Sequence, residues 1–226
     1  MSQFPAIIAA LPREVKGLVR GWNARELPGK VFVYTNGSAV VACAGMGAAR
    51  AVLAVQAALA AGPVTALVSV GLAGACDPAL EVGDLVRAGA VVDSRTGERF
   101  ANPRFESVVV TGDSIASVRE KARLFASYRA AAVDMEAAAV ARLARAHALE
   151  FQAIKVVSDA ANFELADLGR FATPDGQFRE TAFAVHAMLR PYLWGKLMQL
   201  AGNSGRALKA LTAALENELD WYRERV

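Results

Sequence analysis

The chain has 226 residues, a length that corresponds to one ordinary domain. Lysine and arginine outnumber aspartate and glutamate only slightly (25 against 22), and no basic block stands out, which argues against a dedicated nucleic-acid-binding protein. Hydrophobic residues make up 54% of the chain and charged residues 21%, a balance that excludes an intrinsically disordered protein. No apolar run reaches the roughly 18 residues expected of a membrane-spanning helix.

The two cysteines, Cys43 and Cys76, lie in apolar stretches without a neighbouring cysteine or histidine. This isolation argues against a zinc site or a disulfide framework and favours a reducing compartment. The N-terminal segment has no basic residue before its short apolar run, so it indicates a first strand and not a signal peptide. We therefore expect a cytoplasmic protein.

Short apolar runs alternate with alanine-rich runs along the first two-thirds of the chain. The apolar runs predict strands at 4–10, 31–34, 39–44, 64–70, 84–92, 107–111, 130–135 and 151–158. Helices are expected at 12–22, 48–61 and 136–147, and again from residue 178 onward, with breaks near Pro191 and around 202–205. This alternation predicts an α/β fold, a three-layer sandwich with a central mixed sheet flanked by helices. We expect a single domain over 1–226 with a variable helical segment at about 178–226.

Ligands in such folds bind at the carboxyl ends of strands, so the residues that follow each apolar run are the candidates for a site. Glu14 follows the first strand, in the first turn of a helix, where it could also merely complement the helix dipole. Gly71, Leu72, Ala73 and Gly74 follow the strand at 64–70. The two glycines let the backbone approach a ligand closely, although a tight turn after the strand is the alternative interpretation.

Two further strand ends carry carboxylates. Asp134, Met135 and Glu136 end one strand and open a helix. A carboxylate there can accept hydrogen bonds from the two hydroxyls of a sugar, and a methionine can lie against the sugar; ordinary helix N-terminal acids are the alternative. Ser158 and Asp159 end the strand at 151–158. A carboxyl group partly removed from water suits a general acid, with Ser158 to orient it, whereas a helix N-cap is the alternative.

Taken in order, these segments resemble the nucleoside phosphorylase and nucleosidase superfamily, which includes purine and uridine phosphorylases and methylthioadenosine/adenosylhomocysteine nucleosidases. The most specific pieces are VGLAGACDPALEVGDLV at 70–86, TGD at 111–113, VDMEAAAVA at 133–141 and VVSDAAN at 156–162. The resemblance implies a nucleoside phosphorylase-like fold. It also implies cleavage of the N-glycosidic bond between ribose and a purine, with no metal and no organic cofactor.

The resemblance implies a role for each matched residue. Asp159 matches the general acid that protonates N7 of the departing base, and Glu14 matches the acid that positions water in the nucleosidase branch. Glu136 matches the carboxylate that binds the ribose hydroxyls, and Met135 matches the residue packed on the sugar. Ile115 occupies the place of an aromatic residue whose backbone reads the base. These roles agree with the chemistry, because bond cleavage builds positive charge on the ribose and negative charge on the base.

The chain departs from the family pattern at the phosphate site. Leu72 stands where members commonly have a serine, and Ser69 stands where purine phosphorylases carry a phosphate-binding arginine. Arg13 and Arg50 could replace that cation. We therefore expect water as the nucleophile. The alternatives are phosphorolysis, with inorganic phosphate as co-substrate, and a non-catalytic nucleoside-binding relative.

The connection between Phe100 and Ser107 is shorter than in typical members, and 192–198 is apolar and aromatic. Together with Asp93 and 96–99, these features resemble a subgroup associated with hopanoid lipid synthesis, whose proposed substrate is adenosylhopane. The resemblance implies a small-molecule nucleoside with a bulky apolar 5′ group, a pocket open on one side, and peripheral contact with a lipid substrate. It also implies a homo-oligomer, with a dimer favoured. Packing of 192–198 in the core or in a dimer interface is the alternative.

Overall fold

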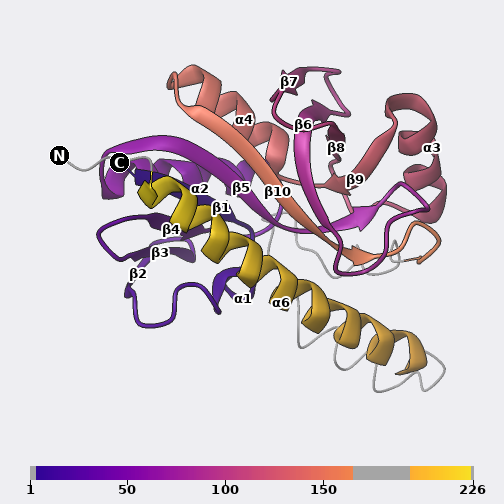
Figure 1. Cartoon of the computed structure of the whole chain (residues 1–226), viewed down its shortest axis with the longest axis horizontal. Helices are drawn as coiled ribbons and strands as arrows, with labels where there is room; N and C mark the ends of the chain where they lie inside the picture. The colour runs from indigo at the N-terminus through magenta and orange to yellow at the C-terminus, as the bar shows by residue number, and fades with distance from the viewer. Residues whose placement is uncertain (1–3, 165–193, 225–226) are drawn as a thin grey trace.

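A computed structural model describes residues 4–164 and 194–224, and for residues 194–201 it describes the backbone alone. The strands are β1 (Phe4–Ala9), β2 (Asn23–Leu27), β3 (Val31–Thr35), β4 (Val40–Cys43), β5 (Val64–Ala75), β6 (Leu85–Asp93), β7 (Arg99–Ala101), β8 (Ser107–Thr111), β9 (Ala130–Asp134) and β10 (Glu150–Asp159). The helices are α1 (Pro12–Val15), α2 (Ala48–Ala61), α3 (Val118–Tyr128), α4 (Ala137–Ala146) and α6 (Trp194–Glu224). Figure 1 shows these elements in chain order.

The strands form one mixed sheet in the order β10-β6-β8-β9-β5-β1-β4-β3-β2, with β7 paired to β6. Because β5 pairs with both β10 and β9, the strands β5, β10, β6, β8 and β9 close into a ring. β1, β4, β5 and β10 run parallel to one another. Their carboxyl ends therefore lie at one edge of the sheet, with β5 between β1 and β10.

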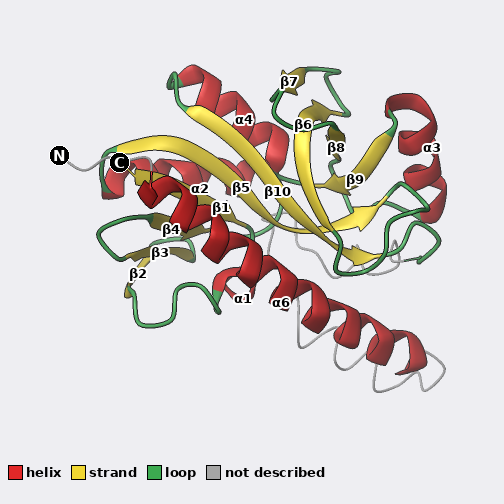
Figure 2. Cartoon of the chain, in the orientation of Figure 1, coloured by secondary structure: helices red, strands yellow, loops and turns green. Residues whose placement is uncertain are grey.

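Helices cover both faces of the sheet (Figure 2). On one face, Leu211, Leu215 and Tyr222 of α6 are buried against apolar residues of β1, β4, β5 and β10. On the other face, the buried alanines and Val55 of α2 pack with Val140 and Ala144 of α4 against β1, β4 and β5. These layers confirm the predicted α/β architecture with a central mixed sheet between helices.

The structure corrects several predicted boundaries. The helix expected over 12–22 ends at Val15 and is followed by turns. β2 has no counterpart among the predicted elements because it is an edge strand with four exposed residues and no apolar alternation. β5 continues through both glycines to Ala75, since β10 and β9 supply hydrogen-bonding partners along this stretch.

Two helices differ from the sequence prediction. α3 was not expected, because the segment is largely polar and only Lys121 and Leu124 of its residues are buried. α6 continues through 202–205, where a break was expected. A glycine in a helix costs about 1 kcal/mol. Burial of a leucine such as Leu211 or Leu215 contributes about 1.5–3 kcal/mol, which is enough to offset two glycines. The expected break at Pro191 lies outside the described residues.

Within the described segments, the structure contains no helix with the length and hydropathy needed to cross a lipid bilayer.

Candidate active site

Two buried carboxylates flank the last part of β5. Glu14 lies on α1, directly after β1, and Asp159 is the last residue of β10. A Cβ atom added to Gly71 would lie 3.1 Å from Glu14 Oε1, and one added to Gly74 would lie 3.0 Å from Asp159 Oδ2. Three residues of a strand span about 10 Å. The two carboxylates therefore approach β5 at points about that far apart, and glycine leaves room for each of them.

Glu14 is held by backbone donors from two elements. The Leu11 N–H donates to Oε2 at 2.8 Å, and the Leu72 N–H donates to Oε1 at 3.3 Å. Burial raises the pKa of Glu14, while these two donors and the Lys155 ammonium oppose the rise. The hydrogen bonds fix the carboxyl group at the end of β5, where it can orient a water molecule.

Asp159 forms a buried ion pair that was not expected from the sequence. The Ser158 hydroxyl donates to Oδ1 at 2.7 Å, as its predicted orienting role requires, and the Lys121 ammonium of α3 pairs with Oδ2. Lys121 also donates to the carbonyls of Ala160 at 3.0 Å and Phe163 at 3.1 Å. The side chains of the pair are only 2% and 5% exposed. Lys121 thus fixes both Asp159 and the backbone that follows β10.

Glu136 lies immediately before α4 and is half-buried. The Gly47 N–H donates to Oε1 at 2.6 Å, and the Met135 N–H donates to Oε2 at 3.3 Å. Gly47 has φ +90°, a conformation that favours glycine. Burial and the negative charge of Asp134 raise the pKa of Glu136 to about 7, and the charge of Glu14 adds to the rise. The electrostatic coupling between Glu14 and Glu136 indicates that β1 and β9 bring them into one site.

Asp134 belongs to a network beneath this site. The Thr111 hydroxyl donates to Oδ1 at 2.7 Å, the Ala137 N–H donates to Oδ2 at 2.9 Å, and the Lys155 ammonium lies 2.8 Å from Oδ2. Lys155 also donates to Ser69 Oγ at 3.0 Å. Asp134 is 4% exposed and both its oxygens are engaged within the protein. It therefore fixes the start of α4, and with it Glu136, instead of being turned outward as expected for a sugar ligand.

The remaining candidate residues lie at or near the same strand ends. Gly71 and Ala73 are buried, whereas Leu72, Met135, Ser158 and Ile115 are half-buried. Leu72 packs against the core beneath α6, and Ile115 lies in the loop between β8 and α3. Residues 192 and 193, and the side chains of 194–198, lie outside the described residues.

The shortened connection between Phe100 and Ser107 lies away from the carboxylates. Asn102 Nδ2 donates to the Phe151 carbonyl at 3.3 Å, near the start of β10, whereas Asp159 ends that strand. Eight residues of a strand span about 26 Å. The opening expected beside the nucleoside pocket is therefore at the opposite end of β10.

The other residues that suggested the lipid-linked subgroup serve local structure. Asp93 and Glu98 form ion pairs with Arg142 of α4, at 2.8 and 2.9 Å, and Glu98 also pairs with Arg145. These contacts tie the β6–β7 hairpin to α4, so Asp93 and Glu98 have a structural role whatever the substrate is.

Lys155 and Lys121 were not among the residues predicted from the sequence, for different reasons. Lys155 stands among apolar residues of a buried strand, and a charge in such a run is a usable signal, because buried lysines are almost always paired. Lys121 gave no comparable signal, since α3 itself was not predicted. In the described segments, no three histidine, cysteine, aspartate or glutamate side chains are grouped as metal ligands would be.

Comparison with known proteins assigns the family. The family model described as the phosphorylase superfamily matches residues 6–107 and 101–193. No curated protein matches the chain. Among solved structures, 5′-methylthioadenosine/S-adenosylhomocysteine nucleosidase from Helicobacter pylori, with butyl-thio-DADMe-Immucillin-A, is 17% identical with a TM-score of 0.66, covering 96% of this chain and 99% of that chain.

Two further solved structures share the fold. S-adenosylhomocysteine nucleosidase from Streptococcus pyogenes is 21% identical with a TM-score of 0.62, covering 71% of this chain and 85% of that chain. Futalosine hydrolase of Helicobacter pylori is 20% identical with a TM-score of 0.61, covering 70% and 88%. At these identities the structural likeness shows the fold alone. Because the family model covers most of the sequence, the chain belongs to the phosphorylase superfamily.

Proposed function

We propose that this protein hydrolyses the N-glycosidic bond of a purine nucleoside and releases the free base. The observation that carries the proposal is the pair of buried carboxylates, Glu14 and Asp159, that flank Gly71 and Gly74 of β5. Inverting glycosidases use a corresponding division of roles, with one carboxyl group as general acid and the other as the base that activates water.

In the proposed reaction, the base lies toward Asp159 and the ribose toward Glu14 and Glu136. Asp159 in its protonated form gives a proton to N7 of the purine, so that the electrons of the C1′–N9 bond leave with the base. Positive charge develops on the ribose and is stabilised by the nearby carboxylates. Glu14 accepts a proton from the water that attacks C1′. Glu136 accepts hydrogen bonds from the ribose hydroxyls, and Met135 packs on the sugar.

Lys121 positions Asp159 in the proposed mechanism. Its ammonium pairs with Oδ2, while the Ser158 hydroxyl donates to Oδ1, so the carboxyl group is held through both of its oxygens.

Water is the proposed nucleophile, because the residues that could hold phosphate are otherwise engaged. Ser69 is fully buried and its Oγ accepts a hydrogen bond from Lys155. The guanidinium of Arg50 donates to the carbonyl of Gly29 at 2.6 Å and to that of Ala44. Glu14 would repel a phosphate anion at the end of β5. Phosphorolysis is the alternative, with Arg13 then a candidate phosphate ligand.

We also propose the finer identity of the substrate: an adenine nucleoside with a 5′-modified, apolar ribose, of the adenosylhopane class. The resemblance of the apolar and aromatic segment 192–198 to the lipid-linked subgroup supports this choice, whereas the Leu72 side chain packs against the core beneath α6. The backbone of Leu72, Ala73 and Ile115 is proposed to contact the nucleoside. The protein is proposed to act as a cytoplasmic homo-oligomer.

One assay tests both the proposed hydrolysis and the proposed identity of the substrate. The purified protein is incubated with adenosine, methylthioadenosine and an adenosine with a long 5′-alkylthio group, with and without phosphate, and the base and sugar products are identified. We expect free adenine and a free sugar, rates indifferent to phosphate, and the highest kcat/KM for the alkyl substrate. A ribose-1-phosphate product that requires phosphate would overturn hydrolysis. Absence of adenine release from all three would overturn nucleoside cleavage.

A further inference from the structure

An exposed surface beside Glu14 carries positive charges and no negative ones. This cationic surface comes from the turns that follow β1 and from the middle of α6, and its exposed cations are Arg13, Lys16, Arg20, Arg206 and Lys209. Residues 11–22 contain one acidic residue, Glu14, which is buried, and residues 202–215 contain none. The sequence shows no basic block here because the two parts lie near opposite ends of the chain.

A helical turn that continues past α1 places the first three cations on one face. The Val19 N–H donates to the Val15 carbonyl at 3.0 Å, so helical hydrogen bonding extends beyond the last residue of α1. Arg13, Lys16 and Arg20 are spaced by three and four residues, which brings side chains to the same side of a helix. The buried residues of this segment lie on its other side: Glu14, Val15 and Leu18.

α6 packs directly against this turn (Figure 2). A Cβ atom added to Gly17 would lie 2.6 Å from Thr212 Oγ1. Gly17 directly follows Lys16, and Lys209 precedes Thr212 by less than one helical turn. The exposed cations of the two segments therefore border the same contact and form one surface.

The cationic surface is not neutralised within the described residues. The ion pairs of the described segments use other side chains. Arg206 donates to a neutral group, the amide oxygen of Asn203, at 2.9 Å. The net charge of the whole chain is only +3, so attraction to an anionic partner is concentrated at this surface.

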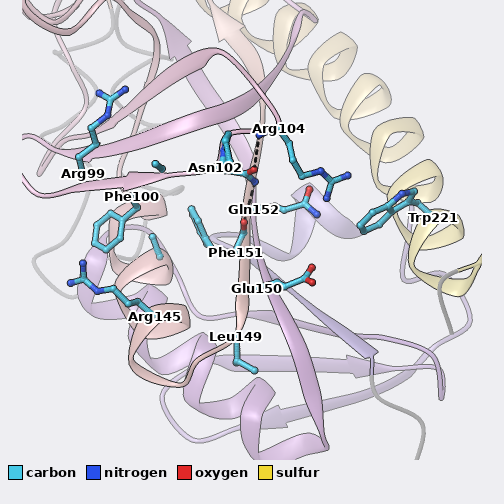
Figure 3. Close-up of a pocket in the computed structure, with 13 residues that line it drawn as sticks. Arg99, Phe100, Asn102, Arg104, Arg145, Leu149, Glu150, Phe151, Gln152 and Trp221 are labelled. Carbon is cyan, nitrogen blue, oxygen red and sulfur yellow. Dashed lines mark hydrogen bonds between the residues drawn. The ribbon is translucent and has the colours of Figure 1, made fainter.

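The arginines around the cavity at the start of β10 are arranged differently (Figure 3). Arg145 is paired with Glu98, and the guanidinium of Arg104 lies 4.5 Å from the centre of the Trp221 ring. Arg99 and Arg104 point away from each other in Figure 3. These arginines therefore do not form a second surface of the same kind.

We propose that the cationic surface binds an anionic lipid membrane. Clusters of about 4–8 lysines and arginines on an amphipathic segment are typical of surfaces that bind anionic headgroups, and each such cation strengthens binding about 5-fold. The surface borders the candidate site, because Glu14 lies between Arg13 and Lys16 in the chain.

The choice of a membrane over a nucleic acid, which carries the same charge, rests on the proposed function. A nucleoside with a large apolar 5′ group partitions into a bilayer. An enzyme that cleaves it has to bring the end of β1, with Glu14, to the bilayer surface. A cationic surface next to Glu14 would hold the protein there in that orientation.

Co-sedimentation of the full chain with vesicles tests the proposal. Vesicles of phosphatidylcholine alone are compared with vesicles of equal parts phosphatidylcholine and phosphatidylglycerol, at low and at high salt. We expect binding to the anionic vesicles only, and its loss at high salt, because salt screens exposed charges. Lys16→Gln/Arg20→Gln should weaken this binding by about 10-fold or more, and so should Arg206→Gln/Lys209→Gln.

Arg95→Gln/Arg99→Gln is the matched control, because both are exposed arginines of the β6–β7 hairpin, which Figure 1 shows on the side of the molecule opposite α1. It removes the same charge and should leave vesicle binding unchanged, and urea unfolding should show that all variants are folded. Vesicle binding requires no turnover, so a failure of nucleoside hydrolysis and a failure of membrane binding are separate results.

Three results would overturn the proposal. They are undetectable binding to the anionic vesicles, equal binding to both kinds of vesicle, and equal weakening by the control variant and the cationic-surface variants. Binding to a DNA duplex without vesicle binding, abolished by the two cationic-surface variants, would assign the surface to nucleic acid and also overturn it.

Discussion

Replacing Glu136 with glutamine should stabilise the folded protein at alkaline pH while it weakens ribose binding. Glu136 is the group whose pKa is raised to about 7, against an ordinary value of 4.5, by burial and by the negative charge of Asp134. Folding therefore makes ionisation of this carboxyl unfavourable. An amide has no charge to bury, and its oxygen can still accept the hydrogen bond from the Gly47 N–H.

The sign and size of the effect follow from proton linkage. Between about pH 4.5 and 7 the folded protein holds a proton on Glu136 that the unfolded chain has lost, so the free energy of unfolding falls as pH rises through this window. The difference of about 2.5 units (7 minus 4.5) corresponds to about 3 kcal/mol. Relative to wild type, glutamine should be more stable by about 1 kcal/mol at pH 5 and about 3 kcal/mol at pH 8, reduced by loss of the weak Met135 hydrogen bond.

Urea unfolding of both proteins at pH 5 and pH 8 measures this difference. Glu81→Gln is the control, because Glu81 is exposed and its substitution should change stability equally at both pH values. The same Glu136 variant should bind ribonucleosides more weakly but change 2′-deoxynucleoside binding less, since a charged hydrogen bond to the diol contributes about 1.5–3 kcal/mol. A variant that is less stable than wild type at pH 8 would refute the electrostatic argument.

Other substitutions test the remaining contacts. Lys121→Met should lower the free energy of unfolding by about 3–5 kcal/mol, because it leaves Asp159 buried without its cation; an unchanged stability would contradict the role of this pair. Gly74→Ala should reduce turnover but retain the fold, since its Cβ would lie 3.0 Å from Asp159 Oδ2; wild-type kinetics would show that the glycine is unnecessary. Lys155→Met should lower the free energy of unfolding by about 3–5 kcal/mol, as it leaves Asp134 buried without its cation; a change below about 1 kcal/mol would refute this. Burial raises the pKa of the Cys76 thiol to about 12, so native Cys76 should react with a thiol reagent only on unfolding; rapid modification of the folded protein would contradict its burial.

The sequence predicted the sheet and most of its strands because β5 and β10 are apolar runs buried on both faces, and such runs carry a strong local signal. It failed where tertiary contacts decide the outcome. α6 continues through two glycines because its apolar face is buried against the sheet, and β2 forms at an edge from exposed residues. The local pattern of apolar residues predicts neither the continuation of α6 nor the formation of β2.

The candidate site was predictable where its carboxylates directly follow apolar strands. Glu14, Glu136 and Asp159 follow their strands as expected, and the sheet order brings their elements together. The two lysines that form buried ion pairs at the site, Lys121 and Lys155, were not predictable. Lys121 reaches Asp159 from a largely polar helix, and the Asp134–Lys155 pair joins two strands, β9 and β10, that are not hydrogen-bonded to each other in the sheet.

The central claim is that Asp159 protonates the leaving base, and the rate of adenine release by Asp159→Asn tests it most directly. The variant is compared with wild type on the best nucleoside found, under identical conditions, with the nucleoside dissociation constant measured for both proteins. An amide cannot donate a proton comparably, so turnover should fall by about 10²–10⁴-fold while binding changes little. Turnover within a few-fold of wild type would contradict the account and remove Asp159 from the reaction.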